Sequence, residues 1–202
     1  MPRPQPFTFP NTIRYEPRTK RNVMRKRGIG ASEIPAIAGL SEFTSPRDVW
    51  REKTGLAAFE GNQATRIGNF FEPYFFAYLQ TYHFDGFVMQ RNNGIYFQTD
   101  HEAKPLPHYC TPDGFAVNFT TPKPVLIELK VSSYFSKKRL ACAEAQVQYT
   151  MHLLDVDEAK VCVLQGTKVD IVKIPRDREE GKRLYALARE FWEYFVVKGV
   201  EP

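Results

Sequence analysis

The apolar positions between residues 62 and 83 recur at a spacing close to 3.6 residues, which predicts a long amphipathic helix. Those positions are Ile67, Phe70, Phe71, Tyr74, Phe75, Tyr78, Leu79 and Tyr82. Pro73 lies inside the stretch and predicts a kink or a new helical turn there. Similar spacing predicts two further helices, over residues 136–154 and 178–198.

Short apolar runs between these stretches predict strands. They cover residues 86–90, 94–98, 115–118 and 125–131, followed by a hairpin of 161–164 with 168–174. Two short helices precede the long one. We expect Ser32 to cap the first, and Ser45 the second, which ends at Gly55. This order is typical of one α/β domain with a central mixed β-sheet flanked by helices.

Composition narrows the class of protein. The 202 residues are 43% hydrophobic, which is enough for a core, and we expect a single domain over residues 21–202. No apolar run is long enough to cross a membrane, and the N-terminus lacks the apolar core of a signal peptide. Three cysteines without CxxC spacing favour reduced thiols, and therefore a cytoplasmic protein.

The net charge of +5 is concentrated at the N-terminus. Residues 1–27 contain eight Lys or Arg side chains and one acidic residue, whereas the rest of the chain is close to neutral. Such a distribution indicates a polyanionic partner, most often nucleic acid, although a solvated tail is an equally good interpretation. Residues 1–20, rich in Pro, Arg and Thr, show no periodicity and predict a flexible or extended basic arm.

A group of charged residues accompanies two of the predicted strands. Glu128 and Lys130 are two residues apart on a strand, so both side chains point to one face. Three apolar residues precede them, as in a strand buried on both sides, where such charges need a partner. Asp113 lies in a Pro-Asp-Gly turn just before the preceding strand, and a hairpin would bring it beside Glu128.

Two adjacent carboxylates repel each other, and a divalent cation relieves that repulsion. Oxygen ligands of this kind select Mg²⁺ or Mn²⁺. Lys130 could then orient or help deprotonate a water molecule for attack on a phosphodiester. The alternative is that Pro-Asp-Gly is only a turn and that Glu128 and Lys130 lie on a surface edge strand.

Four sequence blocks in a fixed order add to this interpretation. They are RKRGIGASE at residues 25–33, GNFFE at 68–72, TPDG at 111–114 with IELK at 127–130, and AQVQYTM at 145–151. With these blocks the chain resembles the PD-(D/E)xK nuclease superfamily, and within it the phage lambda exonuclease / YqaJ-like viral recombinase family. The resemblance covers residues 25–151.

The resemblance implies a 5'-to-3' exonuclease that degrades one strand of linear double-stranded DNA and leaves 3' single-stranded tails for phage-type recombination. Asp113, Glu128 and the Leu129 carbonyl match the metal ligands, and Glu72 matches a helix carboxylate near a second Mg²⁺ or Mn²⁺ ion. Lys130 matches the water-orienting lysine, and Gln146 a glutamine of the active site.

The same resemblance assigns Arg25 and Ser32 to the terminal 5' phosphate. A Ser32 cap would also leave the backbone N–H groups of a helix start free to bind an anion. Lys137, Lys138 and Arg139 could follow the phosphate backbone, or simply begin a solvated helix.

Gln146 and Gln148 cannot share one helix face, and the motif favours Gln146 in the site. The family further implies a homotrimeric ring around the DNA, a single-strand annealing protein as partner, and a phage or prophage origin in a bacterial cytoplasm. Two other functions stay open: a structure- or sequence-specific DNA endonuclease of the same superfamily, and a non-catalytic DNA-binding module.

Overall fold

The computed structural model describes residues 6–15, 21–58, 61, 63–118, 120 and 123–202. Its elements in chain order are β1 (Thr12–Tyr15), α1 (Arg21–Arg25), β2 (Ile29–Gly30), η1 (Ala31–Glu33), α2 (Ile34–Ile37), α3 (Pro46–Thr54), α4 (Gln63–Tyr82), β3 (Phe87–Arg91), β4 (Ile95–Thr99), β5 (Pro105–Cys110), β6 (Gly114–Asn118), β7 (Pro124–Ser132), α5 (Lys137–Leu154), β8 (Glu158–Gln165), β9 (Lys168–Pro175), α6 (Arg178–Glu190) and η2 (Phe191–Val197). The predicted α/β class is confirmed.

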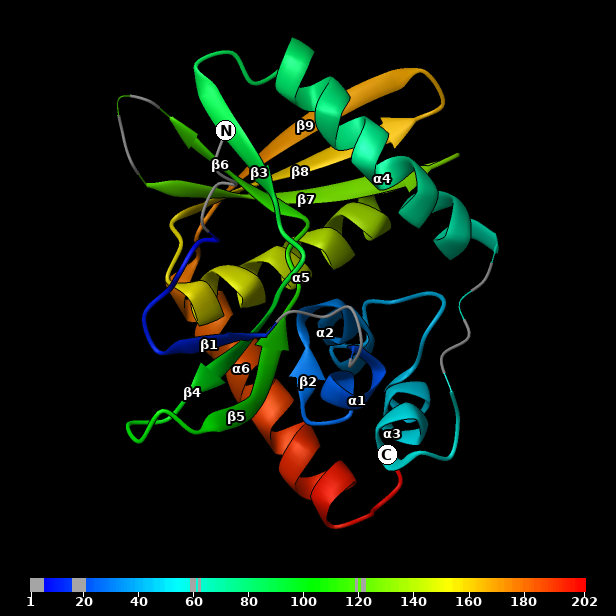
Figure 1. Ribbon diagram of the computed structural model, residues 1–202. Helices are drawn as coiled ribbons and strands as arrows, with labels where there is room; N and C mark the ends of the chain where they lie inside the picture. Colours follow the sequence, from blue (N-terminus) through cyan, green and yellow to red (C-terminus); the bar gives the residue numbers. More distant parts are fainter. Residues whose placement is uncertain (1–5, 16–20, 59–60, 62, 119, 121–122) are drawn as a thin grey trace.

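The central sheet has five strands in the order β3-β6-β7-β8-β9. It is mixed, because β7 pairs antiparallel with β6 and parallel with β8. Helices α4 and α5 lie on its opposite faces (Figure 1). Alternate residues of β7 serve the two layers: Leu126 joins the apolar cluster that includes α5, whereas Ile127 and Leu129 join the cluster that includes α4.

A second sheet, in the order β1-β4-β5-β2, was not expected. The sequence shows β4, but Pro105 and Pro107 hide β5 because proline is rare within strands. The two residues of β2 are too few to give a pattern; they pair parallel with β5 through Ile29 and His108.

The described part of the predicted flexible or extended arm, residues 6–15, is extended and packs onto the domain. Thr12–Tyr15 form β1, which pairs antiparallel with β4. Before it, the rings of Phe7 and Phe9 each lie 5.0 Å from the ring of Phe115. Aromatic packing and strand pairing therefore fix this segment to the domain, a tertiary effect that a lack of periodicity cannot reveal. Residues 1–5 and 16–20 lie outside the described residues.

The helix ends follow the sequence signals in part. Ser45 caps α3 by accepting a hydrogen bond from the Asp48 N–H at 3.2 Å, and Gly55 ends it with a φ of 82°. Helix α4 continues across Pro73 as one helix. The predicted C-terminal helix consists of α6 followed by the π-helix η2.

Ser32 is not a helix cap, contrary to the prediction. It lies inside the short 3₁₀ helix η1, where Gly30 precedes the first turn. The Glu33 carboxylate takes over the capping by accepting the Gly30 N–H at 2.7 Å. Helix α2, which follows, has only four residues, so no long helix begins at Ser32.

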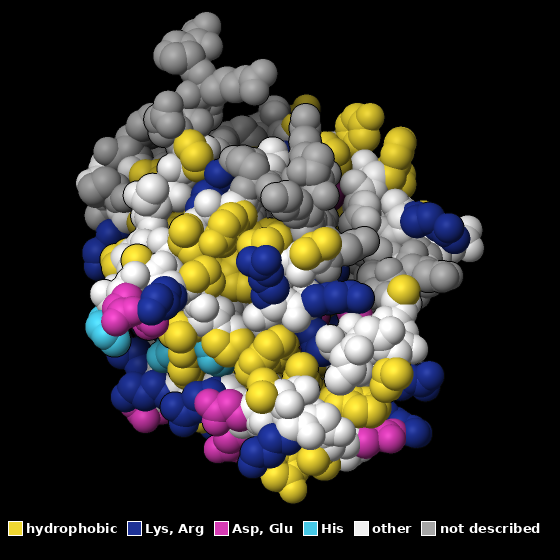
Figure 2. All heavy atoms as spheres, turned by 60° about the horizontal axis from the view of Figure 1, so that its bottom comes forward, with side chains coloured by type: hydrophobic (Ala, Val, Ile, Leu, Met, Phe, Trp, Pro, Cys, Tyr) yellow, Lys and Arg dark blue, Asp and Glu magenta, His cyan; other side chains and the backbone are white. Residues whose placement is uncertain are grey.

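Charge and apolar surface are mixed on the face that presents α3 and α6. Lys and Arg side chains form separate groups there, divided by hydrophobic side chains (Figure 2).

Among the described residues, no helix is both long and apolar enough to span a membrane.

Candidate active site

Strand β7 carries the charged pair at the centre of the candidate site. The Lys130 Nζ donates to Glu128 Oε1 at 2.8 Å, so the two side chains share one face as predicted. The strand lies between β6 and β8, and the Glu128 side chain is only 6% exposed. The alternative of a surface edge strand is therefore wrong.

Asp113 lies beside this pair. Strand β6 pairs Gly114 with Ile127, so the register places Asp113 opposite Glu128. The Asp113 Oδ2 accepts the Leu129 N–H at 2.6 Å, which ties the turn before β6 to the middle of β7. The sequence prediction that a hairpin joins the two carboxylates is confirmed.

Gln146 of α5 completes the group. Its Oε1 accepts a hydrogen bond from Lys130 Nζ at 3.0 Å, and its Nε2 donates to Glu128 Oε1 at 2.7 Å. Gln148 serves a different purpose: its Nε2 donates to the Pro175 carbonyl at 2.9 Å, and its Oε1 accepts the Asp177 N–H at 2.9 Å. Gln146 is thus the glutamine that faces the site, and Gln148 fastens the end of β9.

Glu72 approaches the group from α4, on the other side of the sheet. Its Oε1 forms an ion pair with Arg91 Nη2 of β3 at 2.7 Å. Arg91 was not singled out from the sequence, because a lone arginine just after an expected strand gives no signal. The ion pair holds Glu72 at the rim of the site despite the proline that follows it.

Arg25 and Ser32 reach the same place from the N-terminal elements. A cleft of about 480 Å³ is lined by Arg25, Ser32, Thr65, Gly68, Asn69, Glu72, Tyr109, Thr111, Asp113, Glu128, Leu129, Lys130, Val131 and Gln146. It therefore brings together eight residues predicted from the sequence, which come from α1, η1, α4, β7, α5 and the turn before β6. Ser32 contributes an exposed side chain and not a helix start.

The basic residues at the start of α5 divide into two kinds. Lys138 pairs with Glu42 at 3.3 Å, and Arg139 donates to Ser132 Oγ and to the Tyr134 carbonyl. Both line a second cavity next to the cleft, whereas Lys137 is exposed and lines neither. Ser136 caps α5 by accepting the Arg139 N–H at 3.2 Å.

The electrostatics of the cleft favour an added cation. Burial, followed by the nearby Glu128 and Glu72 carboxylates, raises the pKa of Asp113 well above its usual value. Burial would lower the pKa of Lys130, but Glu128 and Asp113 more than offset this and raise it. One ammonium group thus faces several carboxylates, and the ionised form is most disfavoured at Asp113.

The donor set fits a hard divalent ion. Asp113 and Glu128 offer carboxylate oxygens, and Leu129 lines the same cleft. The structure shows no group of three or more His, Cys, Asp or Glu side chains poised to hold a metal within the part of the chain that it describes. Glu72 is turned to Arg91, and Glu128 to Lys130 and Gln146, so these side chains would have to reorient toward an ion.

A comparison with protein families decides where the chain belongs. The model of the YqaJ-like viral recombinase domain matches residues 22–155, more than half of the chain. The match contains all the residues predicted for the site. This protein is a member of the YqaJ-like viral recombinase family.

Solved structures share the fold of this YqaJ-like domain. An alkaline exonuclease (LHK-Exo) from Laribacter hongkongensis has a TM-score of 0.65 at 15% identity, covering 91% of this chain and 95% of that chain. A phage related exonuclease from Haemophilus somnus has a TM-score of 0.59 at 16% identity, covering 89% and 99%. The fold is thus that of the PD-(D/E)xK nucleases. No curated protein matched the sequence.

A second ion pair of the YqaJ-like domain was missed. Lys53 of α3 pairs with Glu33 at 2.7 Å, and its Nζ also donates to the Arg25 carbonyl at 2.8 Å. Arg25 Nη2 lies 3.6 Å from the same Glu33 carboxylate, and Tyr109 packs beside the group. The block at residues 25–33 contains Glu33. Lys53 is 20 residues away, on a helix whose sequence is typical of an exposed surface helix.

Proposed function

We propose that this chain is a Mg²⁺- or Mn²⁺-dependent 5'-to-3' exonuclease that removes nucleotides from one strand of linear double-stranded DNA and leaves 3' single-stranded tails. The observation that carries the proposal is the cleft in which Asp113, Glu128, Lys130 and Gln146 lie together with Arg25. Family membership supports it, as do similar structures that are named exonucleases, one of which was solved in complex with dAMP.

The acidic residues would hold the metal. Asp113, Glu128 and the Leu129 carbonyl would bind the first ion, and Glu72 a second one after leaving Arg91. When bound, the ions lower the pKa of water and neutralise charge that develops on the phosphate. Burial and acidic neighbours raise the pKa of Asp113, and the positive charge of a bound ion would counteract that rise.

Lys130 would orient the attacking water. Its Nζ is held by Glu128 Oε1 and Gln146 Oε1, which leaves one of its three N–H groups to point at a reacting group in the cleft. Gln146 bonds to both members of the pair and so fixes the position of the ammonium group. A proton donor or acceptor positioned in this way contributes roughly 10²- to 10⁴-fold to a rate.

Recognition of the DNA end would fall to Arg25 and Ser32. Both line the cleft that contains the acidic group, so a terminal 5' phosphate there would place the next phosphodiester beside Asp113 and Glu128. A guanidinium and a hydroxyl recognise phosphate without reading a base, which suits an enzyme that is specific for ends and indifferent to sequence.

The assembly and its partners are proposed from the family resemblance alone. They are a homotrimeric ring around the duplex, a single-strand annealing protein that loads onto the 3' tail, and a phage or prophage origin in a bacterial cytoplasm. Lys137, Lys138 and Arg139 would follow the DNA backbone beside the cleft.

The deciding experiment compares DNA ends. End-labelled linear duplex with a 5' phosphate is incubated with the full chain, with and without Mg²⁺, next to a covalently closed circle. We expect metal-dependent release of mononucleotides from the linear DNA and an intact circle. Cutting of the circle would favour the endonuclease, and binding without any cleavage the non-catalytic module.

A further inference from the structure

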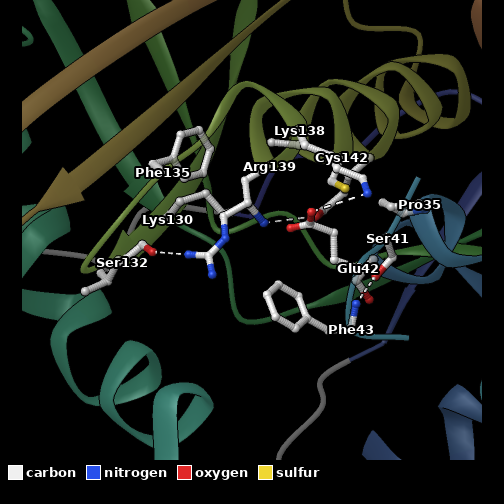
Figure 3. A pocket seen from close by; sticks show the side chains of 14 residues that line it. Pro35, Ser41, Glu42, Phe43, Lys130, Ser132, Phe135, Lys138, Arg139 and Cys142 are labelled. Atoms are coloured by element: carbon white, nitrogen blue, oxygen red, sulfur yellow. Dashed lines mark hydrogen bonds and ion pairs between the residues drawn. The ribbon is translucent and has the colours of Figure 1, made fainter. Parts of the chain in front are cut away.

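A second cavity of about 280 Å³ adjoins the catalytic cleft (Figure 3). The two share Ser32, Lys130, Val131 and Gln146 as lining residues, so they adjoin at these residues. Its other walls come from the loop after α2, the segment between β7 and α5, and the first turns of α5. Nothing in the proposed chemistry uses this space.

Two flat groups line this cavity and contact each other. The Phe43 side chain is 74% exposed, and the Arg139 guanidinium lies over its ring, 5.2 Å from Cζ to the centroid. Arg139 is itself held by hydrogen bonds to Ser132 Oγ and the Tyr134 carbonyl, and Figure 3 shows its guanidinium between Ser132 and Phe43. Aromatic rings and guanidinium planes are the protein groups on which nucleic-acid bases stack.

The position of the cavity suits one nucleotide in particular. In the proposed function the 5' phosphate lies at Arg25 and Ser32, and the bond to be cut lies at Asp113 and Lys130. The sugar of the terminal nucleotide joins these two phosphates. Its base must leave the duplex stack to let the strand enter the cleft, and the cavity opens beside both Ser32 and Lys130.

We propose that the cavity lined by Phe43 and Arg139 receives the base of the 5'-terminal nucleotide. The inference rests on the proposed exonuclease function and names the part of the substrate that lies next to the reacting phosphate. Stacking on Phe43 would hold any of the four bases, since every base has a π-face. The neighbouring ion pair of Lys138 and Glu42, 3.3 Å apart, adds polar groups at the rim.

The cavity therefore has a task that the phosphate pocket cannot perform. Arg25 and Ser32 identify an end, but a phosphate alone leaves the sugar free to rotate. A stacked base fixes that rotation and so presents the following phosphodiester to Asp113 and Lys130 in one orientation. Phe43 acts as a substrate-positioning residue in this account.

The test uses 5'-phosphorylated duplexes that differ only in the terminal nucleotide, adenine in one and a stable abasic analogue in the other. Release of the first nucleotide is measured under single-turnover conditions with Mg²⁺. We expect the wild type to prefer the adenine end by roughly tenfold. Phe43→Ala should lose that preference, and Phe43→Tyr, which keeps the ring, should retain it.

Tyr82→Ala is the matched control, because Tyr82 is a comparably exposed aromatic at 70% and lines neither cavity. This variant should keep the wild-type preference. Equal rates on the two ends in the wild type, or the same preference in Phe43→Ala, would overturn the proposal.

A binding experiment separates this inference from the proposed function. Calorimetry of the full chain compares dAMP with 2-deoxyribose 5-phosphate, which lacks the base. Roughly tenfold tighter binding of dAMP, lost in Phe43→Ala, supports the base pocket even if the chain cleaves no DNA. Equal binding of the two compounds counts against the pocket even if the chain is an active exonuclease.

Discussion

Two ion pairs of the same residue types occupy very different places in this protein. Glu128 and Lys130 are 2.8 Å apart, and Glu33 and Lys53 are 2.7 Å apart. The Lys130 side chain is 30% exposed and faces the cleft, whereas the Lys53 side chain is 1% exposed. One pair can exchange partners with a substrate, and the other is sealed into the scaffold.

Their neighbours differ in the same sense. Around Lys130 the partners are side chains, Glu128 and Gln146, which can rotate away. Around the second pair they include backbone, since Glu33 accepts the Gly30 N–H and Lys53 donates to the Arg25 carbonyl. The buried pair thus holds the segment that carries Arg25 and Ser32, while the open pair remains available for chemistry.

The largest expected difference between the two ion pairs is in cleavage activity. Lys130→Ala should reduce the rate of metal-dependent cleavage by roughly 10²- to 10⁴-fold, because the proposed water-orienting group is lost. DNA binding, measured by fluorescence anisotropy, should stay near that of the wild type. The change in unfolding free energy should be smaller than in Lys53→Met, because Glu128 keeps Gln146 as a partner. Cleavage at the wild-type rate would remove Lys130 from the mechanism.

Removing the buried pair of Glu33 and Lys53 should lower the stability of the protein. Lys53→Met leaves the Glu33 carboxylate buried without its ammonium partner, and we expect the unfolding free energy to fall by about 3–5 kcal/mol in urea denaturation. Lys123→Met is the control, because Lys123 pairs with Asp157 at the surface, where such pairs contribute about 0–1 kcal/mol. Equal losses in the two variants would show that Lys53 holds no special place in the scaffold.

A third buried pair, the neutral His108 and Tyr149, should make the stability of the protein depend on pH. His108 lies 2.8 Å from the Tyr149 hydroxyl, and burial, followed by the positive charges of Arg189 and His152, lowers its pKa to about 4. The ordinary pKa is 6.5, so between pH 6.5 and pH 4 the unfolded chain binds more protons and stability falls as the pH is lowered. The loss due to this group should approach about 3 kcal/mol.

That pH dependence can be measured by urea denaturation between pH 7 and pH 4. His108→Asn keeps a polar side chain but does not titrate in this range, so its unfolding free energy should fall less steeply than that of the wild type. Parallel curves for the two proteins would contradict the lowered pKa.

Much of the candidate site could be predicted because its parts are local. Glu128 and Lys130 share a face through strand geometry alone, and the turn at Asp113 predicts the hairpin that brings it alongside. Arg91, Glu33 and Lys53 gave no such signal, since each acts through a partner that is distant in sequence. The same holds for the second sheet, where strand pairing across the chain overrides the prolines of β5.

The sequence by itself determined the α/β class, the strand that carries Glu128 and Lys130, and the blocks that place the chain among the YqaJ-like recombinases. The tertiary structure confirmed that Gln146, which the motif favoured over Gln148, meets the charged pair. It alone decided that residues 6–15 pack onto the domain and that Ser32 reaches the cleft without capping a helix. The physical reason is that periodicity reports which side of an element is apolar. The partner of each polar side chain depends on how distant elements pack, because burial makes an unpaired polar group costly.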